Sequence, residues 1–422
     1  MPVTFPNSKP YRNVGGNDAL GILVYERDDD PPFAESSFIR RLNQFGSARG
    51  MPLFAFAPWT WEERNGSVKG WSWNDREGRW EPGRRMLPSV VYDRAWPETD
   101  AEKLRYRQAV RRLRESVKLV FLNGRLPNKG KVYECLAKNR TFSAYIPPTA
   151  LFRGSASLSD WLSKHSHAAF LKPIAGSQGR RVVAIVVAED GTVKLSGRRQ
   201  DNQPFEVEVA NEATALRRIE RWIGSRPYIM QPFLELKGDH GEPFDLRALM
   251  QKGGDGRWSL TGIAARCGSP GMVTANLHGG GKASSARTML SRLFGDIRGR
   301  ELFEEATNMS YMIAVRLENV FGRFAEIGLD YGIDRSGKLW FLEANSKPGR
   351  AAMVSAGAEA ARAAAEQPLS YARSILLRLA TTDTRRSPQG RGCSLATTDM
   401  QRSLQGNGYA TPGRVIHEFD HL

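Results

Sequence analysis

Two carboxylates and one carboxamide lie close together in the sequence, in the last part of the predicted core. Asp330 ends one apolar segment, and Glu343 and Asn345 end the next, with a turn of the Asp-x-Ser-Gly type between the two segments. Residues two apart in a strand point to the same face, and a hairpin brings the first strand alongside the second. We therefore expect the three side chains to converge on one oxygen-lined site, which suits Mg²⁺ bound to phosphate oxygens and water, with Mn²⁺ as the alternative ion.

A metal that is shared with phosphates needs cationic side chains nearby, and Lys172 is the first candidate. It lies at the end of an apolar segment and precedes a turn that contains Gly176, Ser177, Gln178 and Gly179. Small residues let backbone N–H groups approach phosphate oxygens closely. The turn matches neither the Walker A pattern nor the Rossmann glycine pattern. We interpret it as a flap over phosphates, and the alternative is an ordinary hairpin turn.

Residues 228–235 form a further apolar strand that ends in polar groups. A purine base could lie between its apolar side chains and main-chain groups, with a carboxylate near the ribose hydroxyls. The alternative is an ordinary strand exit. Together with the lysine, the glycine turn and the oxygen ligands, this segment fits a purine nucleotide whose phosphates lie near the metal.

Composition places the chain among ordinary globular proteins. It has 422 residues, of which 41% are hydrophobic and 25% charged, so we expect about two to four domains and no global disorder. No apolar stretch is long enough for a membrane span, and the first twenty residues lack the apolar core of a secretory signal. The three cysteines are far apart, which argues against a disulfide framework and a cysteine zinc site, and we expect a cytoplasmic protein.

The net charge of +16 favours an anionic partner without identifying it. Residues 101–118 form a predicted helix with seven basic and two acidic residues. We favour a surface helix whose charges lie in water over a face that binds a polyanion. No zinc-finger or RRM pattern is present, so nucleic acid ranks last among the partners.

Short apolar runs alternate with a helical pattern in residues 17–125, which predicts an α/β domain. The Trp-rich segment 59–85 is expected to be a hairpin or an insertion. The part of the chain after residue 125 contains further β-type segments, with helices expected at 299–321 and 351–380. Residues 1–16 are expected to be disordered, as is the tail 381–422, which contains a short duplication of the sequence LATTD.

The order of these segments resembles that of an ATP-grasp enzyme, and the chain is similar to the YheC/YheD branch, which is associated with bacterial endospore coats. The resemblance covers roughly residues 20–375. Segments 276–281 and 330–349 also resemble ligases that add glutamate to protein or peptide C-termini. The resemblance to the branch rests on five motifs: Val91-Tyr92-Asp93-Arg94, Asn128-Lys129, Pro147-Pro148-Thr149, Phe244-Asp245-Leu246-Arg247 and Asn345-Ser346-Lys347-Pro348-Gly349-Arg350.

This resemblance implies an ATP-grasp fold, in which an N-terminal preATP-grasp α/β domain precedes two α+β lobes, at 126–235 and 236–380, that grip ATP between antiparallel sheets. It implies that Lys129 and Lys172 contact phosphates and that Asp330, Glu343 and Asn345 bind Mg²⁺. Arg247, Arg266 and Asn276 would lie toward the γ-phosphate and the acceptor. The adenine and ribose would be bound by Gln231, Pro232, Phe233, Leu234 and Glu235, with Asp239 as an alternative to Glu235.

The implied reaction activates a carboxylate as an acylphosphate, which an amine then attacks to form an amide bond. Such chemistry needs positioning and charge neutralisation more than acid–base groups. One alternative is a spore-coat or scaffold protein that binds nucleotide without ligation, and another is a nucleic-acid binder. The sequence does not identify the carboxylate or the amine, and its basic surplus favours an acidic peptide or amino acid.

Overall fold

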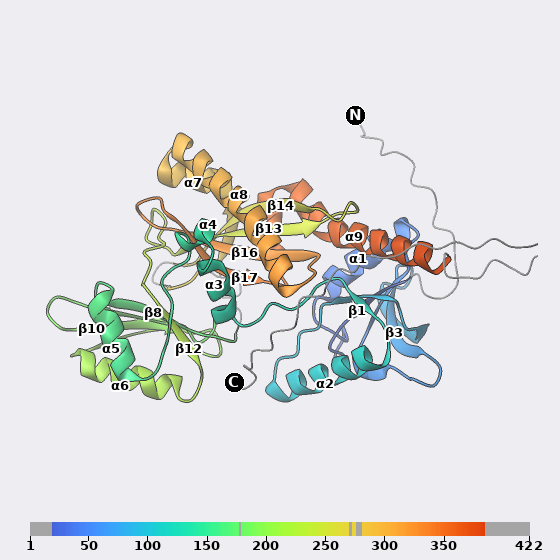
Figure 1. Cartoon of the computed structure of the whole chain (residues 1–422), viewed down its shortest axis with the longest axis horizontal. Coiled ribbons are helices and arrows are strands. Elements are labelled where there is room, and N and C mark those ends of the chain that lie inside the picture. Colours follow the sequence, from blue (N-terminus) through green and yellow to red (C-terminus); the bar gives the residue numbers. More distant parts are fainter. Residues whose placement is uncertain (1–18, 177–178, 270–271, 276–280, 385–422) are drawn as a thin grey trace, which may run out of the picture. The chain divides into compact units, whose positions relative to one another are not determined.

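The computed structural model of the protein describes residues 19–176, 179–269, 272–275 and 281–384. Within them, three β-sheets follow one another along the chain (Figure 1). The predicted disordered ends, 1–16 and most of 381–422, lie outside the described residues, as do the second copy of the duplication and the end of the first. No helix in the described ranges combines the length and the apolar character that crossing a membrane requires.

The N-terminal sheet has six strands in the order β4-β3-β2-β1-β5-β6. Its centre is parallel. Strand β1 (Leu20–Leu23) pairs in parallel with β2 (Leu53–Phe56) on one side and with β5 (Val90–Asp93) on the other. Strand β5 also pairs in parallel with β6 (Val120–Phe121). The four residues of each central strand are all buried, as the continuous apolar runs predict. The predicted α/β unit is therefore present.

Helices cover this sheet on both faces. Helix α1 (Ser36–Ala48) packs on one face, and α2 (Asp100–Ser116) contributes Leu113 to the core on the other. The long helix α9 (Ala358–Thr384) shares the core of α1, through Leu369, Ala372 and Leu376 (Figure 1). A helix from the end of the chain thus packs onto its first sheet.

The Trp-rich segment forms an antiparallel hairpin of β3 (Ser67–Asn74) and β4 (Arg79–Met86), preceded by a short 3₁₀ helix, η1 (Pro58–Thr60). The hairpin extends the edge of the parallel sheet beyond β2. Trp73 and Trp80 lie opposite each other across it, with their rings in edge-to-face contact at 5.4 Å between centroids. Cross-strand aromatic pairs of this kind stabilise a hairpin. The predicted hairpin is confirmed.

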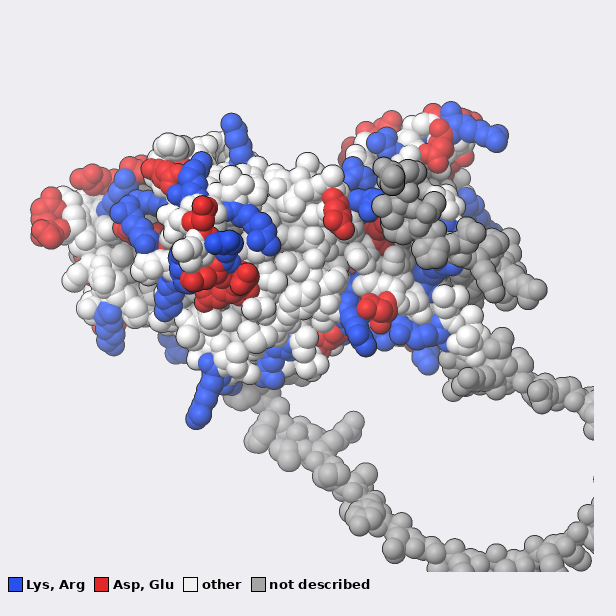
Figure 2. Space-filling view, turned by 90° about the horizontal axis from the view of Figure 1, so that it is seen from above, with Lys and Arg blue, Asp and Glu red and all other residues white. Residues whose placement is uncertain are grey.

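Several cations of the basic helix α2 contact neighbouring acidic or aromatic side chains. A capping box at Thr99 and Glu102 starts it, and its guanidinium groups at Arg105 and Arg114 lie over the rings of Trp59 and Phe121. On the face of the molecule that Figure 2 shows, Lys and Arg lie among Asp and Glu with uncharged surface between them. Charges of both signs are therefore mixed on this face.

The second sheet is antiparallel, in the order β11-β10-β9-β8-β12-β7. Helices α5 (Ser155–Lys164) and α6 (Glu212–Ile223) pack on one face through a core that includes Leu162, Leu216 and Ile219 (Figure 1). Two short helices precede the sheet, α3 (Lys129–Ala137) and α4 (Arg140–Ser143). Its strands are β7 (Ala150–Leu151), β8 (Ala168–Pro173), β9 (Val183–Val187), β10 (Val193–Arg198), β11 (Pro204–Val209) and β12 (Tyr228–Gln231).

The third sheet has five antiparallel strands in the order β15-β14-β13-β16-β17. Helices α7 (Ala286–Phe294) and α8 (Asp296–Phe321) cover one face, where Leu246, Leu329 and Tyr331 join the main hydrophobic core (Figure 1). The strands are β13 (Phe244–Lys252), β14 (Trp258–Cys267), β15 (Lys282–Ser285), β16 (Glu326–Ile333) and β17 (Leu339–Asn345). The opposite face carries the polar side chains of the same strands.

One predicted helix is interrupted. The segment 351–380, expected to be a single helix, begins as a 3₁₀ helix, η3 (Ala351–Ala356), and α9 starts only at Ala358. Between them Gly357 has a φ of +120°, a conformation that residues with a Cβ rarely adopt. An alanine-rich composition indicates helix but does not reveal a break that depends on a single glycine.

Asn123 holds two segments of the chain together from a buried position. Its amide donates to the carbonyls of Glu326 and Ser346, and its carbonyl accepts from the N–H groups of Ala325 and Glu326. In the Asn123→Ala variant these buried backbone groups lose their partners. We expect a loss of about 2–4 kcal/mol in the free energy of unfolding. The urea midpoint of this variant measures it.

The control for this prediction is Gln108→Ala, which removes an exposed amide from α2 and should leave the midpoint unchanged. Equal midpoints for Asn123→Ala and the wild type would contradict the role given to these four hydrogen bonds.

Candidate nucleotide and metal site

A one-residue bulge in β17 decides where the predicted metal ligands point. Opposite β16, the register steps from Phe341 facing Tyr331 to Glu343 facing Asp330, so Leu342 has no partner in the ladder. Phe341 belongs to the core beneath α8. Without the extra residue, Glu343 would point into that core too, because side chains alternate along a strand. The bulge thus places Glu343 and Asn345 on the polar face that Asp330 shares.

Two arginines from neighbouring strands hold Asp330. The Arg247 guanidinium of β13 pairs with both carboxylate oxygens, and its second nitrogen is 2.9 Å from Oδ2. Arg266 of β14 lies 3.1 Å from the same oxygen and forms a two-bonded pair with Asp245. All four residues are less than one-tenth exposed. Buried charges of this kind persist only when they are paired and hydrogen-bonded.

The two arginines fix the charge of Asp330. Burial alone would raise the pKa of its carboxyl, but Arg247 and Arg266 outweigh this effect and lower the pKa to about 2. Asp330 is therefore ionised at neutral pH, the state in which a carboxylate can bind a cation.

Lys172 reaches the third sheet from the second. It lies on β8, and its Nζ donates to the Tyr133 hydroxyl at 2.5 Å and to the Leu342 carbonyl at 3.2 Å. The Tyr133 hydroxyl donates to the same carbonyl. The bulge that turns Glu343 toward the polar face thus also frees the Leu342 carbonyl from the ladder, and this carbonyl holds the lysine.

Burial makes the charge of Lys172 costly. Loss of hydration, with a smaller effect from the nearby charge of Lys129, lowers the pKa of its ammonium to about 7, although Glu343 and Asp330 act in the opposite direction. Lys129, the first residue of α3, lies 3.2 Å from Glu343 through its Nζ. Both predicted phosphate-binding lysines therefore lie beside the predicted metal ligands.

The donor set fits a hard divalent cation. Asp330 and Glu343 face each other on adjacent strands, and Asn345 lies two residues beyond Glu343. Mg²⁺ is typically bound by one or two carboxylates while phosphates and water complete its shell. In the described part of the chain, no group of three or more His, Cys, Asp or Glu side chains gathers in a way that could hold a metal. A site of two carboxylates and one amide needs no such group.

The glycine turn is described only in part. Gly176 and Gly179 have φ values of +155° and +66°, which only glycine adopts readily, so the turn requires both residues. Ser177 and Gln178 lie outside the described residues, and so does Asn276, the predicted acceptor-side residue.

The predicted adenine segment follows β12. Gln231 is buried and donates through Nε2 to the Thr149 hydroxyl at 2.8 Å, and Pro232, Phe233 and Leu234 are half-buried. Glu235 is exposed and pairs with Arg335 at 3.1 Å, and Asp239 pairs with Arg292 at 2.6 Å. Both carboxylates predicted to bind the ribose thus form ion pairs with arginines from the part of the chain that carries the third sheet.

Tyr133 is the site residue that the sequence reasoning missed. It lies one turn after Lys129 on α3, and residues four apart in a helix share a face. That spacing would have indicated a residue near the lysine. Its contact with Lys172 and Leu342, however, depends on a β-bulge that nothing in the sequence marks.

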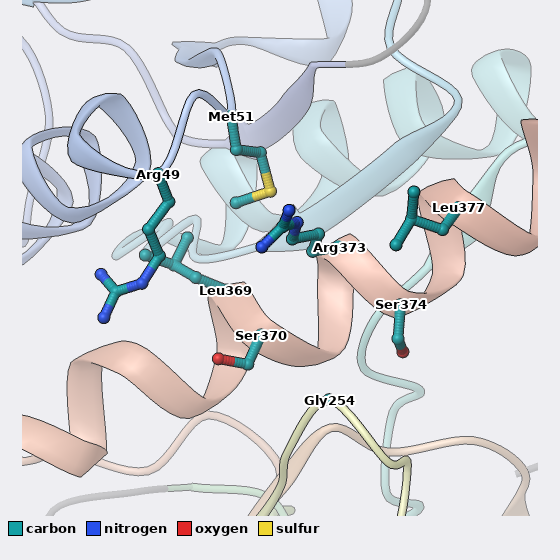
Figure 3. Close-up of a pocket in the computed structure, with 8 residues that line it drawn as sticks. All are labelled: Arg49, Met51, Gly254, Leu369, Ser370, Arg373, Ser374 and Leu377. Carbon is teal, nitrogen blue, oxygen red and sulfur yellow. The ribbon is translucent and has the colours of Figure 1, made fainter. Parts of the chain in front are cut away.

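A separate pocket lies away from these ion pairs. It has a volume of about 360 Å³ and is lined by Arg49, Met51, Gly254 and residues of α9. Figure 3 shows the side chain of Arg373 pointing toward Met51 across this pocket. None of the predicted site residues lines it, so it adds nothing to the nucleotide site.

The chain resembles known proteins over most of its length. It is 25% identical over 338 residues to the endospore coat-associated protein YheC of Bacillus subtilis, covering 79% of this chain and 90% of that protein. It is 28% identical over 329 residues to YheD of the same organism, covering 76% and 69%. Among solved structures, N5-carboxyaminoimidazole synthetase from Staphylococcus aureus superposes with a TM-score of 0.49 at 10% identity, covering 90% and 89%.

The family assignment rests on the part of the sequence that forms the second and third sheets. The model of the YheC/D-like ATP-grasp family matches residues 118–375, which contain both lysines, both arginines and the three predicted metal ligands. The predicted fold class is confirmed, and the chain belongs to the YheC/D-like ATP-grasp family.

Proposed function

We propose that the protein is an ATP- and Mg²⁺-dependent ligase that activates a carboxylate for attack by an amine. The observation that carries this proposal is the meeting of two sheets at one polar site. Lys172 of the second sheet and Lys129 of α3 lie beside Glu343 of the third sheet. In that third sheet, Glu343 of β17 faces Asp330 of β16. Such an arrangement supplies fixed charges of both signs where a polyphosphate and its metal would need them.

Each residue has a role that follows from its position. Asp330, Glu343 and Asn345 would hold Mg²⁺, and this ion would supply charge neutralisation at the phosphate oxygens. Lys129 and Lys172 would bind the phosphates, and Tyr133 keeps the Lys172 ammonium in place. Arg247 and Arg266 bring two further cations to the face of the sheet, where negative charge develops during phosphoryl transfer.

The carboxylate and the amine are proposed by class only. An acidic peptide or amino acid fits the net charge of +16, which attracts anions to the molecule. The relatives YheC and YheD are named as endospore coat-associated proteins, which supports a role in sporulation and a place at the spore coat.

Product analysis tests the proposal. The protein is incubated with MgATP and pools of amino acids and glutamate-rich peptides, and the products are read by mass spectrometry while ADP is measured. We expect ADP release that requires both Mg²⁺ and a co-substrate, and a product that has lost one water. Calorimetric binding of MgATP without any product in these pools or in an extract of the source cells would favour a nucleotide-binding scaffold instead.

A further inference from the structure

A buried set of charges joins the N-terminal sheet to the third sheet. Glu326, at the start of β16, is fully buried and receives hydrogen bonds from four side chains. Arg94 donates to it at 3.2 Å, Gln251 at 3.0 Å and the Tyr92 hydroxyl at 2.5 Å, and Arg350 bonds to both of its oxygens. Two of these donors, Tyr92 and Arg94, belong to the end of β5 and the residue after it, in the N-terminal sheet.

The set is balanced in charge and well paired. Arg94 is inaccessible to solvent and also forms two hydrogen bonds with Glu35, at 2.6 and 2.7 Å, so two carboxylates face two guanidinium groups. Arg350 additionally donates to the Tyr92 hydroxyl, and its guanidinium lies 3.9 Å from the centre of the Phe38 ring. A buried network of this type adds little stability over an apolar packing but specifies one geometry.

The buried charge network fixes the position of the segment that follows Asn345. The N-terminal part of the chain holds four of the five residues 346–350. Asn123 donates to the Ser346 carbonyl, Asp93 accepts from Lys347 at 2.6 Å, Arg94 donates to the Pro348 carbonyl at 3.4 Å, and Tyr92 accepts from Arg350. The motifs 91–94 and 345–350, far apart in the sequence, are therefore partners in space.

The two strands that carry the predicted metal ligands are both connected to the buried charge network. Glu326 lies four residues before Asp330 on β16, and Arg350 lies five residues after Asn345. Asn345 is the last residue of β17, so its position depends on how the following segment is held. The carboxylates have other supports, because Asp330 is fixed by two arginines and Glu343 by Lys129. The amide ligand has no such partner among the contacts of the described residues.

We propose that Tyr92 and Arg94 of the N-terminal sheet are positioning residues for the metal site, acting through Glu326 and Arg350 on Asn345. The N-terminal sheet is then part of the nucleotide site without touching the nucleotide. This inference rests on the proposed function, because it takes Asn345 as a ligand of the ion that accompanies ATP.

The test is a double-mutant cycle on metal affinity. Tyr92→Phe removes one hydroxyl and keeps the shape, and Asn345→Ala removes the amide ligand. The affinity for Mn²⁺ is measured by electron paramagnetic resonance in the wild type, both single variants and the double variant, each saturated with a non-hydrolysable ATP analogue. We expect Tyr92→Phe to weaken Mn²⁺ binding about fivefold and Asn345→Ala about tenfold.

The double variant decides between positioning and simple stabilisation. If Tyr92 acts through Asn345, the double variant binds Mn²⁺ no more weakly than Asn345→Ala alone. Effects that multiply, or a Tyr92→Phe variant with unchanged affinity, would overturn the inference. A wild-type protein that binds no Mn²⁺ with the nucleotide would instead overturn the proposed function, so the two failures are distinguishable.

Tyr331→Phe is the matched control. Its hydroxyl is also buried and also hydrogen-bonded, but to Ser310 of α8 on the opposite face of the third sheet. This variant should lower the melting temperature as Tyr92→Phe does and leave the Mn²⁺ affinity unchanged. An equal loss of Mn²⁺ affinity in both variants would show that any buried hydroxyl matters and would overturn the specific role of Tyr92.

Discussion

The Glu343→Gln variant should lose at least about 100-fold in Mg²⁺-dependent ATP turnover, which corresponds to about 3 kcal/mol of transition-state stabilisation. Glutamine has the same shape but lacks the charge that faces Asp330 and Lys129. A neutral amide can still accept from Lys129, so the fold should survive. Steady-state ADP release measures the loss, and the melting temperature reports on the fold.

Glu206→Gln is the control for this variant. Glu206 of β11 is also a glutamate paired with a lysine, but it is exposed and pairs with Lys194 at the surface, at 2.7 Å. Exposed ion pairs contribute little, so this variant should keep the turnover of the wild type. Full activity in Glu343→Gln would refute Glu343 as a ligand. A comparable loss in both variants would show that the loss of any paired glutamate lowers turnover, and it would equally refute the specific role of Glu343.

The sequence predicted the fold well because its signals are local. Continuous apolar runs mark the buried strands. The helical spacing of Leu302, Ala306 and Met309 marks α8, and these three side chains are all buried in the main core. The pairing of Asp330 with Glu343 followed from a hairpin with a recognisable turn. These inferences need only neighbours along the chain.

Contacts between distant segments could not be derived in this way. Tyr92 and Arg350 are 258 positions apart, and each alone resembles an ordinary polar residue at the end of an element. Both motifs carry the resemblance to the family, yet nothing in a single sequence indicates that one contacts the other. The bulge at Leu342 is equally hidden, because it is one extra residue in an otherwise regular strand.

The Lys172→Met variant should lose about 100-fold in MgATP turnover, because a fixed cation beside the phosphates is removed.

The lysine also predicts a pH dependence of MgATP binding. Its pKa of about 7 without nucleotide results first from burial and then from Lys129. Phosphate oxygens nearby would favour the charged ammonium and raise this pKa. Above pH 7 the free protein must therefore take up a proton when it binds MgATP, and the affinity should fall by up to about tenfold per pH unit.

Below pH 7 the lysine already carries its proton, so this contribution to the pH dependence disappears. Calorimetry at pH 8 in two buffers of different ionisation enthalpy measures the uptake, which should approach one proton per nucleotide in the wild type. Lys172→Arg keeps a permanent charge at the same place and should bind MgATP without this uptake. An equal proton uptake in the arginine variant would assign it to another group. The absence of uptake in the wild type would mean that Lys172 remains charged without nucleotide, held by Tyr133 and the Leu342 carbonyl despite its burial.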